Sequence, residues 1–423
     1  MADRLPSLVP IRQELYAREV GDVGGKLAEE LRRASLQKRV RPGERIAITA
    51  GSRGIANLST VLRGLVDAVR ELGADPFLVP SMGSHGGATA EGQIGVLESL
   101  GVTEKSVGAP IRSSMKTVSL GKTEGGWDVF MDANAHDADG ILVVNRIKPH
   151  TDFRATYESG LMKMMCIGLG KRDQAELVHA TGVKGLQTVI PEVGRAVLAT
   201  GKVRLGIALM ENGYGRTADL IALAPEEIPD REKALLRAAK RHHPSLPFDD
   251  IDVLIVDLIG KEISGAGMDT NVIGRLDIRG ETRWSKKPRV GTIVLLDVSE
   301  PSHGNAIGCG LADITTQRMV DRMNRGTTYT NLLVSTFLER GKIPPTYATD
   351  REAMQAAFFL HRLNLPDQLR VVRIRDTQHI DLLEASPNLL DGLRDSGRVT
   401  VLGDPRPLSF DGEGALAPMR AAA

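Results

Sequence analysis

The chain has 423 residues, which at about 150 residues per domain predicts two or three domains. Its 54 Lys and Arg residues balance 53 Asp and Glu residues, and aromatic residues make up only 4%. The charge balance excludes a basic field for nucleic acid or a polybasic membrane anchor, and the scarcity of aromatic residues disfavours base stacking. Two cysteines, Cys166 and Cys309, suit a reducing compartment, and residues 1–12 lack the apolar core of a signal peptide. We expect a soluble cytoplasmic protein with no nucleic-acid or membrane partner.

Short β-branched runs alternate with helical patterns in the first half of the chain. The runs cover 45–50, 76–80, 140–145 and 203–210. Between the first two runs, apolar residues recur on one helical face over 62–72, and Gly73 ends the helix. This alternation predicts an α/β fold with mainly parallel sheets and right-handed crossovers.

A proline-rich segment over 241–250 (RHHPSLPFDD) shows no periodicity and predicts a linker. We therefore expect two α/β domains, over 1–245 and 246–423, with a cleft between them. In the second domain the pattern predicts strands over 253–257 and 292–297 and helices near 311–324 and 330–339. Another helix is expected to begin at Thr349, because Thr349 and Glu352 form a capping box.

Polar segments, most of them rich in glycine, follow four of the predicted strands. Ligands bind beyond the carboxyl ends of strands in open parallel sheets, so these segments are candidate site loops. His85 lies in GSHGG, between a strand and a helix start, where a neutral imidazole can serve as a general base. His150 follows Lys148-Pro149 at another strand end. Either histidine alone is more often a turn or surface residue, but two at one sheet edge favour function.

The segment 158–182 carries three further candidates. Lys163 lies among apolar residues, so it must reach solvent, pair with another group or react as an amine. His179 ends a predicted helix over 173–180 and is either a favourable charge at the helix C-terminus or a metal ligand. Cys166 is a buried filler or a thiolate, and the filler is the more common case.

Arg53 follows the first strand, where it can bind a carboxylate or phosphate through two hydrogen bonds. The surrounding loop, GSRGIANLS, matches neither the Walker A motif nor the dinucleotide fingerprint. The sequence also lacks H-E-x-x-H and paired C-x-x-C, and no nucleophile elbow follows these strands. Hydrolase functions therefore have little support.

Taken in order, Ser52-Arg53, GSHGG with His85, KPH with His150, and Lys163 with His179 form a specific constellation. Over about residues 45–277 it resembles the lactate racemase family, the nickel-pincer-nucleotide enzymes that interconvert 2-hydroxy acid stereoisomers. The resemblance implies a racemase or epimerase that transfers hydride reversibly between substrate and cofactor. It also implies that the N-terminal domain binds the cofactor and carries the catalytic residues, while the C-terminal domain closes the substrate cleft.

The resemblance assigns a role to each of these residues. His85 and His150 are the two acid/base catalysts, and His179 is the protein ligand to nickel. Lys163 can bind the nucleotide cofactor, a nickel pyridinium-3,5-bisthiocarboxylic acid mononucleotide, covalently. Ser52 and Arg53 are expected at the cofactor, and Arg53 also at the substrate or the transferred group.

The sequence departs from the family pattern in two places. The first loop reads Ala50-Gly51-Ser52-Arg53, where the family has Asp-x-Thr-Arg, so this loop offers no carboxylate at that position to accept a hydrogen bond from the cofactor. In the second domain the family's Gln and Lys have no clear counterparts, and Lys261, Asp269 and Asn271 are the substrate-binding candidates. Their loop, 261–271, is polar, which favours an extended polar 2-hydroxy acid over lactate, unless the loop is only a solvated hinge.

Two other functions remain as alternatives. A metal-dependent hydrolase or lyase would use His85, His150 and His179 as direct ligands. A non-catalytic nucleotide-binding module would use the glycine-rich strand ends only to hold an anion. The sequence leaves the oligomeric state undecided, a homo-oligomer included.

Overall fold

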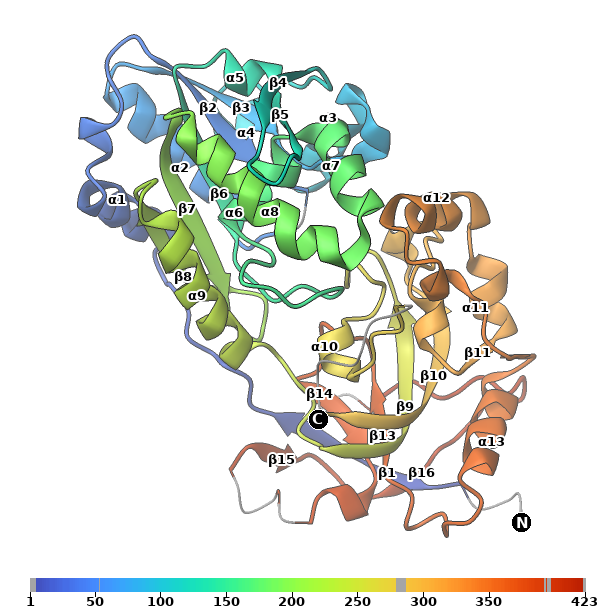
Figure 1. Ribbon diagram of the computed structural model, residues 1–423. Helices are drawn as coiled ribbons and strands as arrows, with labels where there is room; N and C mark the ends of the chain where they lie inside the picture. The colour runs from blue at the N-terminus through green and yellow to red at the C-terminus, as the bar shows by residue number, and fades with distance from the viewer. Residues whose placement is uncertain (1–4, 53, 279–286, 392, 394–396, 421–423) are drawn as a thin grey trace. The chain divides into compact units, whose positions relative to one another are not determined.

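The computed structural model describes residues 5–52, 54–278, 287–391, 393 and 397–420. The chain divides into two compact units, one formed by Ala17–His243 and the other by Met1–Tyr16 together with Pro244–Ala423. Each unit combines one large β-sheet with covering helices, which confirms the predicted α/β class (Figure 1). Among the described residues, no helix is both long and apolar enough to cross a membrane.

The sheet of the 17–243 unit has the strand order β3-β2-β6-β7-β8. Its first four strands are parallel and match the four predicted runs, because each run is apolar enough to be buried on both faces. The fifth strand follows β7 through a hairpin and pairs with it antiparallel. The strands are β2 (Arg45–Ala50), β3 (Asp75–Pro80), β6 (Gly140–Arg146), β7 (Val203–Glu211) and β8 (Thr217–Leu223).

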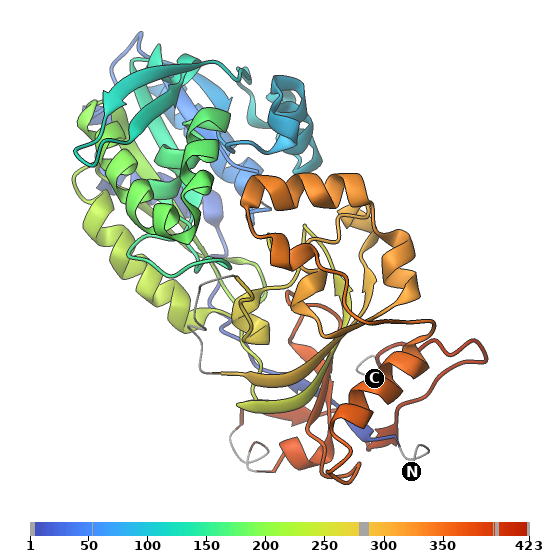
Figure 2. The same ribbon diagram turned by 45° about the vertical axis from the view of Figure 1, so that its right-hand side comes forward.

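Helices pack on both faces of this sheet (Figures 1 and 2). Successive strand residues face opposite sides, so Leu205 and Ile207 of β7 join the core under α1 and α2, while Gly206 between them faces Leu161 and Ile228. A small hairpin, β4 (Thr117–Lys122) with β5 (Asp128–Asp132), completes the unit. The helices are α1 (Val23–Arg33), α2 (Leu58–Glu71), α3 (Ala90–Ser99), α4 (Glu104–Val107), α5 (Ala133–His136), α6 (Leu161–Lys163), α7 (Lys171–Ala180), α8 (Gly182–Ala199) and α9 (Ile228–His242), with the π-helix η3 (Met164–Gly168) after α6.

The sheet of the other unit is mixed. Its order is β12-β11-β10-β9-β13-β14-β1-β15, with β16 also paired to β1. Strands β12 to β13 of this order are parallel, as predicted, whereas the half around β1 is antiparallel. These strands are β9 (Asp250–Ile259), β10 (Arg289–Val298), β11 (Ile314–Thr316), β12 (Thr346–Tyr347), β13 (Val371–Ile374), β14 (Leu382–Ala385), β15 (Val399–Val401) and β16 (Arg406–Pro407).

Three helices of this unit lie near the predicted positions: α11 (Gln317–Arg322), α12 (Arg325–Ser335) and α13 (Asp350–Leu360). The short helix α10 (Thr270–Ile273) was not predicted. The side chain of Thr349 accepts a hydrogen bond from the N–H of Glu352, so α13 begins where the capping pattern places it. The predicted bounds of α11 and α12 were displaced by several residues. Both helices begin with an N-cap hydrogen bond, to Thr316 and to Asn324, but neither has the Glu or Gln at the third helical position that marks a capping box in the sequence.

The N-terminal strand β1 (Ser7–Gln13) belongs to this second sheet, although the sequence analysis placed it in a domain over 1–245. It pairs antiparallel with β14, with Ile11 opposite Leu383, and Ile11 is fully buried in that core. The side-chain amide of Gln13 also donates to the carbonyl of Ile380 at 2.6 Å. A single apolar strand carries no signal of which sheet it will join, so chain order alone predicted the wrong unit.

Candidate active site

The helical segment formed by α6 and η3 packs against the ends of β2 and β3. Glycines make this close packing possible: a Cβ on Gly51, just after β2, would lie 3.2 Å from Cε of Met164. A Cβ on Gly83, after β3, would lie 2.9 Å from Cγ2 of Ile167. The loops that follow two strands and the helix that carries Lys163 therefore meet at one edge of the sheet.

Lys163 and His150 form one pair at this edge. Nζ of Lys163 lies 2.7 Å from Nε2 of His150, and both side chains are partly buried. On the other side of the ring, Nδ1 of His150 accepts a hydrogen bond from the N–H of Asp152 at 3.1 Å. The ring packs beside Phe153, with 4.6 Å between ring centres. Of the three outcomes expected for Lys163, the structure shows pairing.

The loop that carries His150 is held by a fully buried carboxylate, Glu158. Glu158 accepts hydrogen bonds from the N–H of His150 at 2.8 Å and of Ala155 at 3.1 Å. Its other contacts are ionic: Nζ of Lys240 from α9 lies at 2.5 Å, and Arg154 lies at 3.4 Å while also donating to the His150 carbonyl at 2.7 Å. The position of His150 is thus set by hydrogen bonds within its loop and by an ion pair to α9.

A second residue of α9, Glu232, binds the first turn of the helical segment that carries Lys163. Its buried carboxylate accepts the N–H of Met162 at 3.0 Å, at the start of the helix that carries Lys163. Burial raises the pKa of Glu232 to about 7, although the hydrogen bonds from Met162 and Leu161 act in the opposite direction. Gly160 has no side chain to block the carboxylate, which a Cβ there would overlap.

Ser52 and His85 form the second pair. Oγ of Ser52 lies 2.5 Å from Nδ1 of the half-buried His85. His85 is followed by a 3-10 turn, Gly86–Ala88, and α3 begins only at Ala90 with Thr89 as its N-cap. The N-terminus of α3, with its dipole, therefore lies one turn beyond His85. The hydroxyl of Ser52 contacts the imidazole directly.

The His85 loop rests on a buried network centred on Lys171. Nζ of Lys171 donates to the carbonyl of Pro80 and to Oε1 of Gln93 at 3.1 Å, and it pairs with Asp132 at 3.0 Å. Gln93 in turn donates to the carbonyl of Gly83 at 2.9 Å. Burial lowers the pKa of Lys171 and raises the pKa of Asp132, while their mutual attraction opposes both shifts.

His179 lies in the last turn of α7, as the sequence predicts. Ala175, one turn earlier on the same helix face, lies against Gly83, since a Cβ there would be 3.4 Å from Cβ of Ala175. This places His179 on the face of α7 that adjoins the His85 loop. Within the described ranges, no three or more His, Cys, Asp or Glu side chains gather as a metal site, so the three-histidine alternative has no structural support.

The other residues predicted for the site are Cys166, Arg53 and three residues of the second unit. Cys166 is fully buried, and burial raises the pKa of its thiol, which agrees with a filler and not a thiolate. Arg53 lies outside the described residues. Lys261, Asp269 and Asn271 belong to the other unit. There Lys261 donates to the carbonyl of Gly265 at 3.0 Å, and Asp269 caps α10 and accepts from Nδ2 of Asn271 at 2.7 Å.

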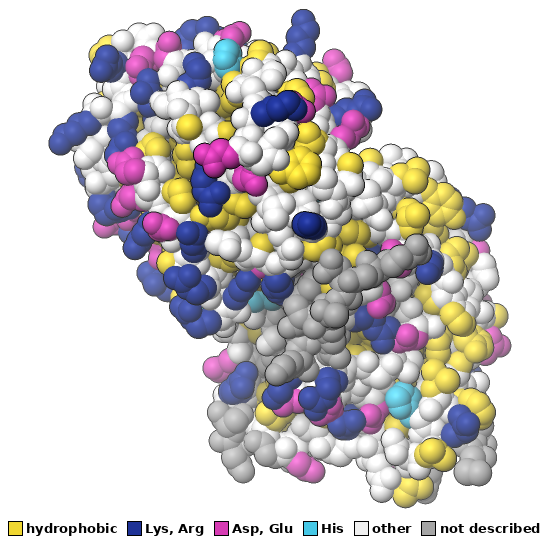
Figure 3. Space-filling view, in the orientation of Figure 1, with side chains coloured by type: hydrophobic (Ala, Val, Ile, Leu, Met, Phe, Trp, Pro, Cys, Tyr) yellow, Lys and Arg dark blue, Asp and Glu magenta, His cyan; other side chains and the backbone are white. Residues whose placement is uncertain are grey.

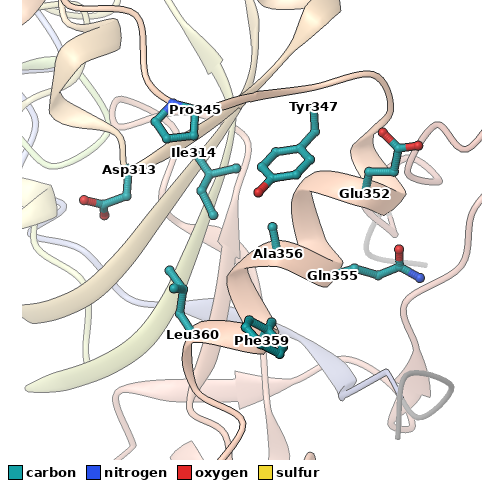
Figure 4. Close-up of a pocket in the computed structure, with 9 residues that line it drawn as sticks. All are labelled: Asp313, Ile314, Pro345, Tyr347, Glu352, Gln355, Ala356, Phe359 and Leu360. Carbon is teal, nitrogen blue, oxygen red and sulfur yellow. The ribbon is translucent and has the colours of Figure 1, made fainter.

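A pocket of 520 Å³ occurs in that other unit, against β11, β12 and α13 (Figure 4). Its wall is largely apolar, and hydrophobic side chains also gather on the molecular surface over α11 to α13 (Figure 3). None of the residues predicted to act in catalysis or binding lines it. The lining residues are Asp313, Ile314, Pro345, Tyr347, Glu352, Gln355, Ala356, Phe359 and Leu360.

Sequence reasoning missed Glu158, Glu232 and Lys171, the charged residues that support the two pairs. Glu232 and Lys171 stand in helices among other charged residues, where a solvent-exposed position is the ordinary expectation. One signal in the sequence was Gly160, because a side chain at this position would overlap the buried carboxylate of Glu232.

Comparisons with known proteins gave a match to one family model and a match to a solved structure. Residues 11–188 match the family model of the lactate racemase N-terminal domain. Among solved structures, the chain is similar to the lactate racemase apoprotein from Thermoanaerobacterium thermosaccharolyticum, at 14% identity and a TM-score of 0.50, over 79% of this chain and 85% of that one. No curated protein matches. The structural match shows a shared fold, and the match over residues 11–188 supports the lactate racemase family for that part of the chain.

Proposed function

We propose that the protein is a racemase or epimerase of a 2-hydroxy acid that works with a nickel-pincer nucleotide. The family match over residues 11–188 supports the reaction class. Two side-chain contacts at one edge of the sheet carry the proposal. Lys163 contacts His150, and Ser52 contacts His85. Two imidazoles and an amine in one region are the groups that this chemistry needs.

The residues present fit the proposed cofactor. A single histidine ligand, His179, suits a nickel ion whose other ligands come from an organic group. In the part of the chain that the structure describes, no group of three or more His, Cys, Asp or Glu side chains gathers as a metal site. Lys163 offers a partly buried amine to the nucleotide, and Ser52 and Arg53 are proposed as further cofactor contacts. When bound, the group supplies a reversible acceptor for the hydride from the substrate carbon.

His85 and His150 are proposed to move the hydroxyl proton of the substrate. The two enantiomers present their hydroxyl groups to opposite sides, so each needs its own base. If Nδ1 of His85 donates to Oγ of Ser52, then Nε2 carries the lone pair that can accept the proton. Arg53 is proposed to bind the substrate carboxylate, a role that suits its planar guanidinium.

For the substrate, we propose an extended polar 2-hydroxy acid, such as a sugar acid or a hydroxy diacid. Lys261, Asp269 and Asn271 are the proposed contacts to its distal polar groups. The support is the composition of the loop 261–271, which offers charged and amide groups and little apolar surface to a methyl or phenyl group.

The nickel content of purified variants tests the assignment. The protein would be produced in cells that make the cofactor and are supplied with nickel, and metal content and intact mass would be recorded. We expect His179→Ala to lose nickel, whereas His85→Ala and His150→Ala keep it and lose turnover. His136→Ala, at a partly exposed histidine of α5, is the matched control. Equal nickel loss in all three site variants, or stoichiometric zinc in the wild type, would contradict the proposal.

A further inference from the structure

The hydrogen bonds of His150 fix which of its nitrogens carries the proton. Nδ1 accepts the N–H of Asp152 at 3.1 Å, and an accepting ring nitrogen has no proton of its own. The carboxylate of Asp152 lies 3.7 Å from Nδ1, which is too far for a competing hydrogen bond. A neutral His150 therefore carries its proton on Nε2.

That Nε2–H faces Nζ of Lys163 at 2.7 Å. An ammonium group has three donors and no acceptor, so it cannot accept this hydrogen bond, whereas an uncharged amine can accept it through its lone pair. The other titratable or charged groups around the pair are Asp152, Arg154, Glu158, Cys166, Glu232 and Lys240.

We propose that, in the protein without cofactor, Lys163 is an uncharged nucleophilic amine held by the Nε2–H of His150. An uncharged amine is the reactive form of a lysine, so the cofactor-free protein holds Lys163 ready to attack an electrophilic group. The charge state of Lys163 goes beyond the proposed function and does not depend on it.

Chemical labelling of the cofactor-free protein tests the charge state. An ordinary lysine, with a pKa near 10.4, is uncharged in about one molecule in 2,500 at pH 7. Treated with the N-hydroxysulfosuccinimide ester of acetic acid, Lys163 should be acetylated at least ~10-fold faster than the exposed Lys184, even with its partial burial. Between pH 7 and 9 its rate should stay nearly flat, while that of Lys184 rises about tenfold per pH unit. Peptide mass spectrometry follows both residues in one sample.

Variants and nitrogen NMR test the partner. His150→Phe should slow the labelling of Lys163 toward that of Lys184, and His136→Phe should leave it unchanged. In wild-type protein at pH 7, ¹⁵N shifts should place the His150 proton on Nε2. Lys163→Arg, which keeps a donor but cannot accept, should move the proton to Nδ1 or leave the ring charged.

The inference is overturned if Lys163 and Lys184 show parallel rates across this pH range, or if His150 in the wild type carries its proton on Nδ1. The wild-type measurements need no substitution, so a variant that misfolds does not decide the matter. They also need neither nickel nor substrate, so an absence of racemase activity would count against the proposed function and not against the charge state of Lys163.

Discussion

Oγ of Ser52 lies 2.5 Å from Nδ1 of His85, which joins the residue after β2 to the loop after the neighbouring strand β3. The hydroxyl is uncharged and polarises the imidazole less than a carboxylate would. In this chain, a serine hydroxyl thus contacts and orients a proposed catalytic base.

Ser52→Ala should therefore lower kcat per bound nickel, beyond any loss of the cofactor that Ser52 is proposed to contact. The imidazole of His85 would lose its contact with the hydroxyl, and general base catalysis of this kind contributes ~10²–10⁴-fold, so loss of orientation should cost roughly tenfold in kcat. Ser52→Thr keeps the hydroxyl and is the matched control. If nickel content fell while kcat per nickel stayed constant, Ser52 would act only as a cofactor contact and would not position His85.

Lys171→Met should destabilise the 17–243 unit. The substitution leaves Asp132 buried without its cation, and breaking a buried pair from one side costs about 3–5 kcal/mol. Urea unfolding followed by Trp127 fluorescence, in a Trp284→Phe background, reports on this unit. The double variant Lys171→Met/Asp132→Asn should recover part of the loss, and Lys184→Met, at an exposed lysine, should change little. Additive effects of the two substitutions would contradict the coupling.

Glu232 should make the stability of the same unit depend on pH. Burial raises its pKa from 4.5 to about 7, so the folded state favours the protonated acid. Its contribution to the free energy of unfolding is fully present below pH 4.5 and is lost as pH rises to about 7, a fall of about 3 kcal/mol at 1.36 kcal/mol per pKa unit. Glu232→Gln should remove this dependence between pH 5 and pH 8, whereas the exposed Glu176→Gln should preserve it. The same slope in wild type and Glu232→Gln would disprove the assignment.

The substrate prediction concerns the loop 261–271. A panel of 2-hydroxy acids, assayed by deuterium exchange at C2, should give faster turnover with sugar acids or hydroxy diacids than with lactate. Asn271→Ala should raise KM for the better substrate about tenfold, since an unpaired polar group costs ~1–3 kcal/mol. Asn364→Ala, at an exposed asparagine of the same unit, is the control. Lactate or phenyllactate turning over faster than every polar acid would refute the prediction.

Much of the sheet that surrounds the candidate site could be predicted, because the sequence patterns that indicate its strands are local. The four parallel strands are continuous apolar runs, and the polar residues that follow them had to gather at one edge of the sheet. His85 and His150 were predicted in this way, whereas Lys163 and His179 were predicted from the helical segment 158–182. Thr349 marked the start of α13 for a similar reason, because a capping pair needs only four residues of sequence.

The parts that could not be predicted depend on partners far apart in the chain. The position of His150 depends on Glu158 and on Lys240 of α9, and no short pattern links the three. Glu232 and Lys171 are charged residues whose burial is decided by what packs over them, and the amphipathic pattern of their helices does not record it. The pairing of Lys163 with His150 follows from a loop geometry that only the folded chain supplies.

The place of β1 has a consequence for synthesis. Gln13 and Ile380 hydrogen-bond across 367 positions, with the whole 17–243 unit inserted between them. Synthesis proceeds at ~5–20 residues per second, so β1 is made roughly 20–75 seconds before its partner strand. The inserted unit can already fold in that interval. An unpaired apolar strand invites association with other chains during that interval. Pro10, which has no N–H to donate, lies in the middle of β1 and makes the waiting strand a poorer template for such pairing.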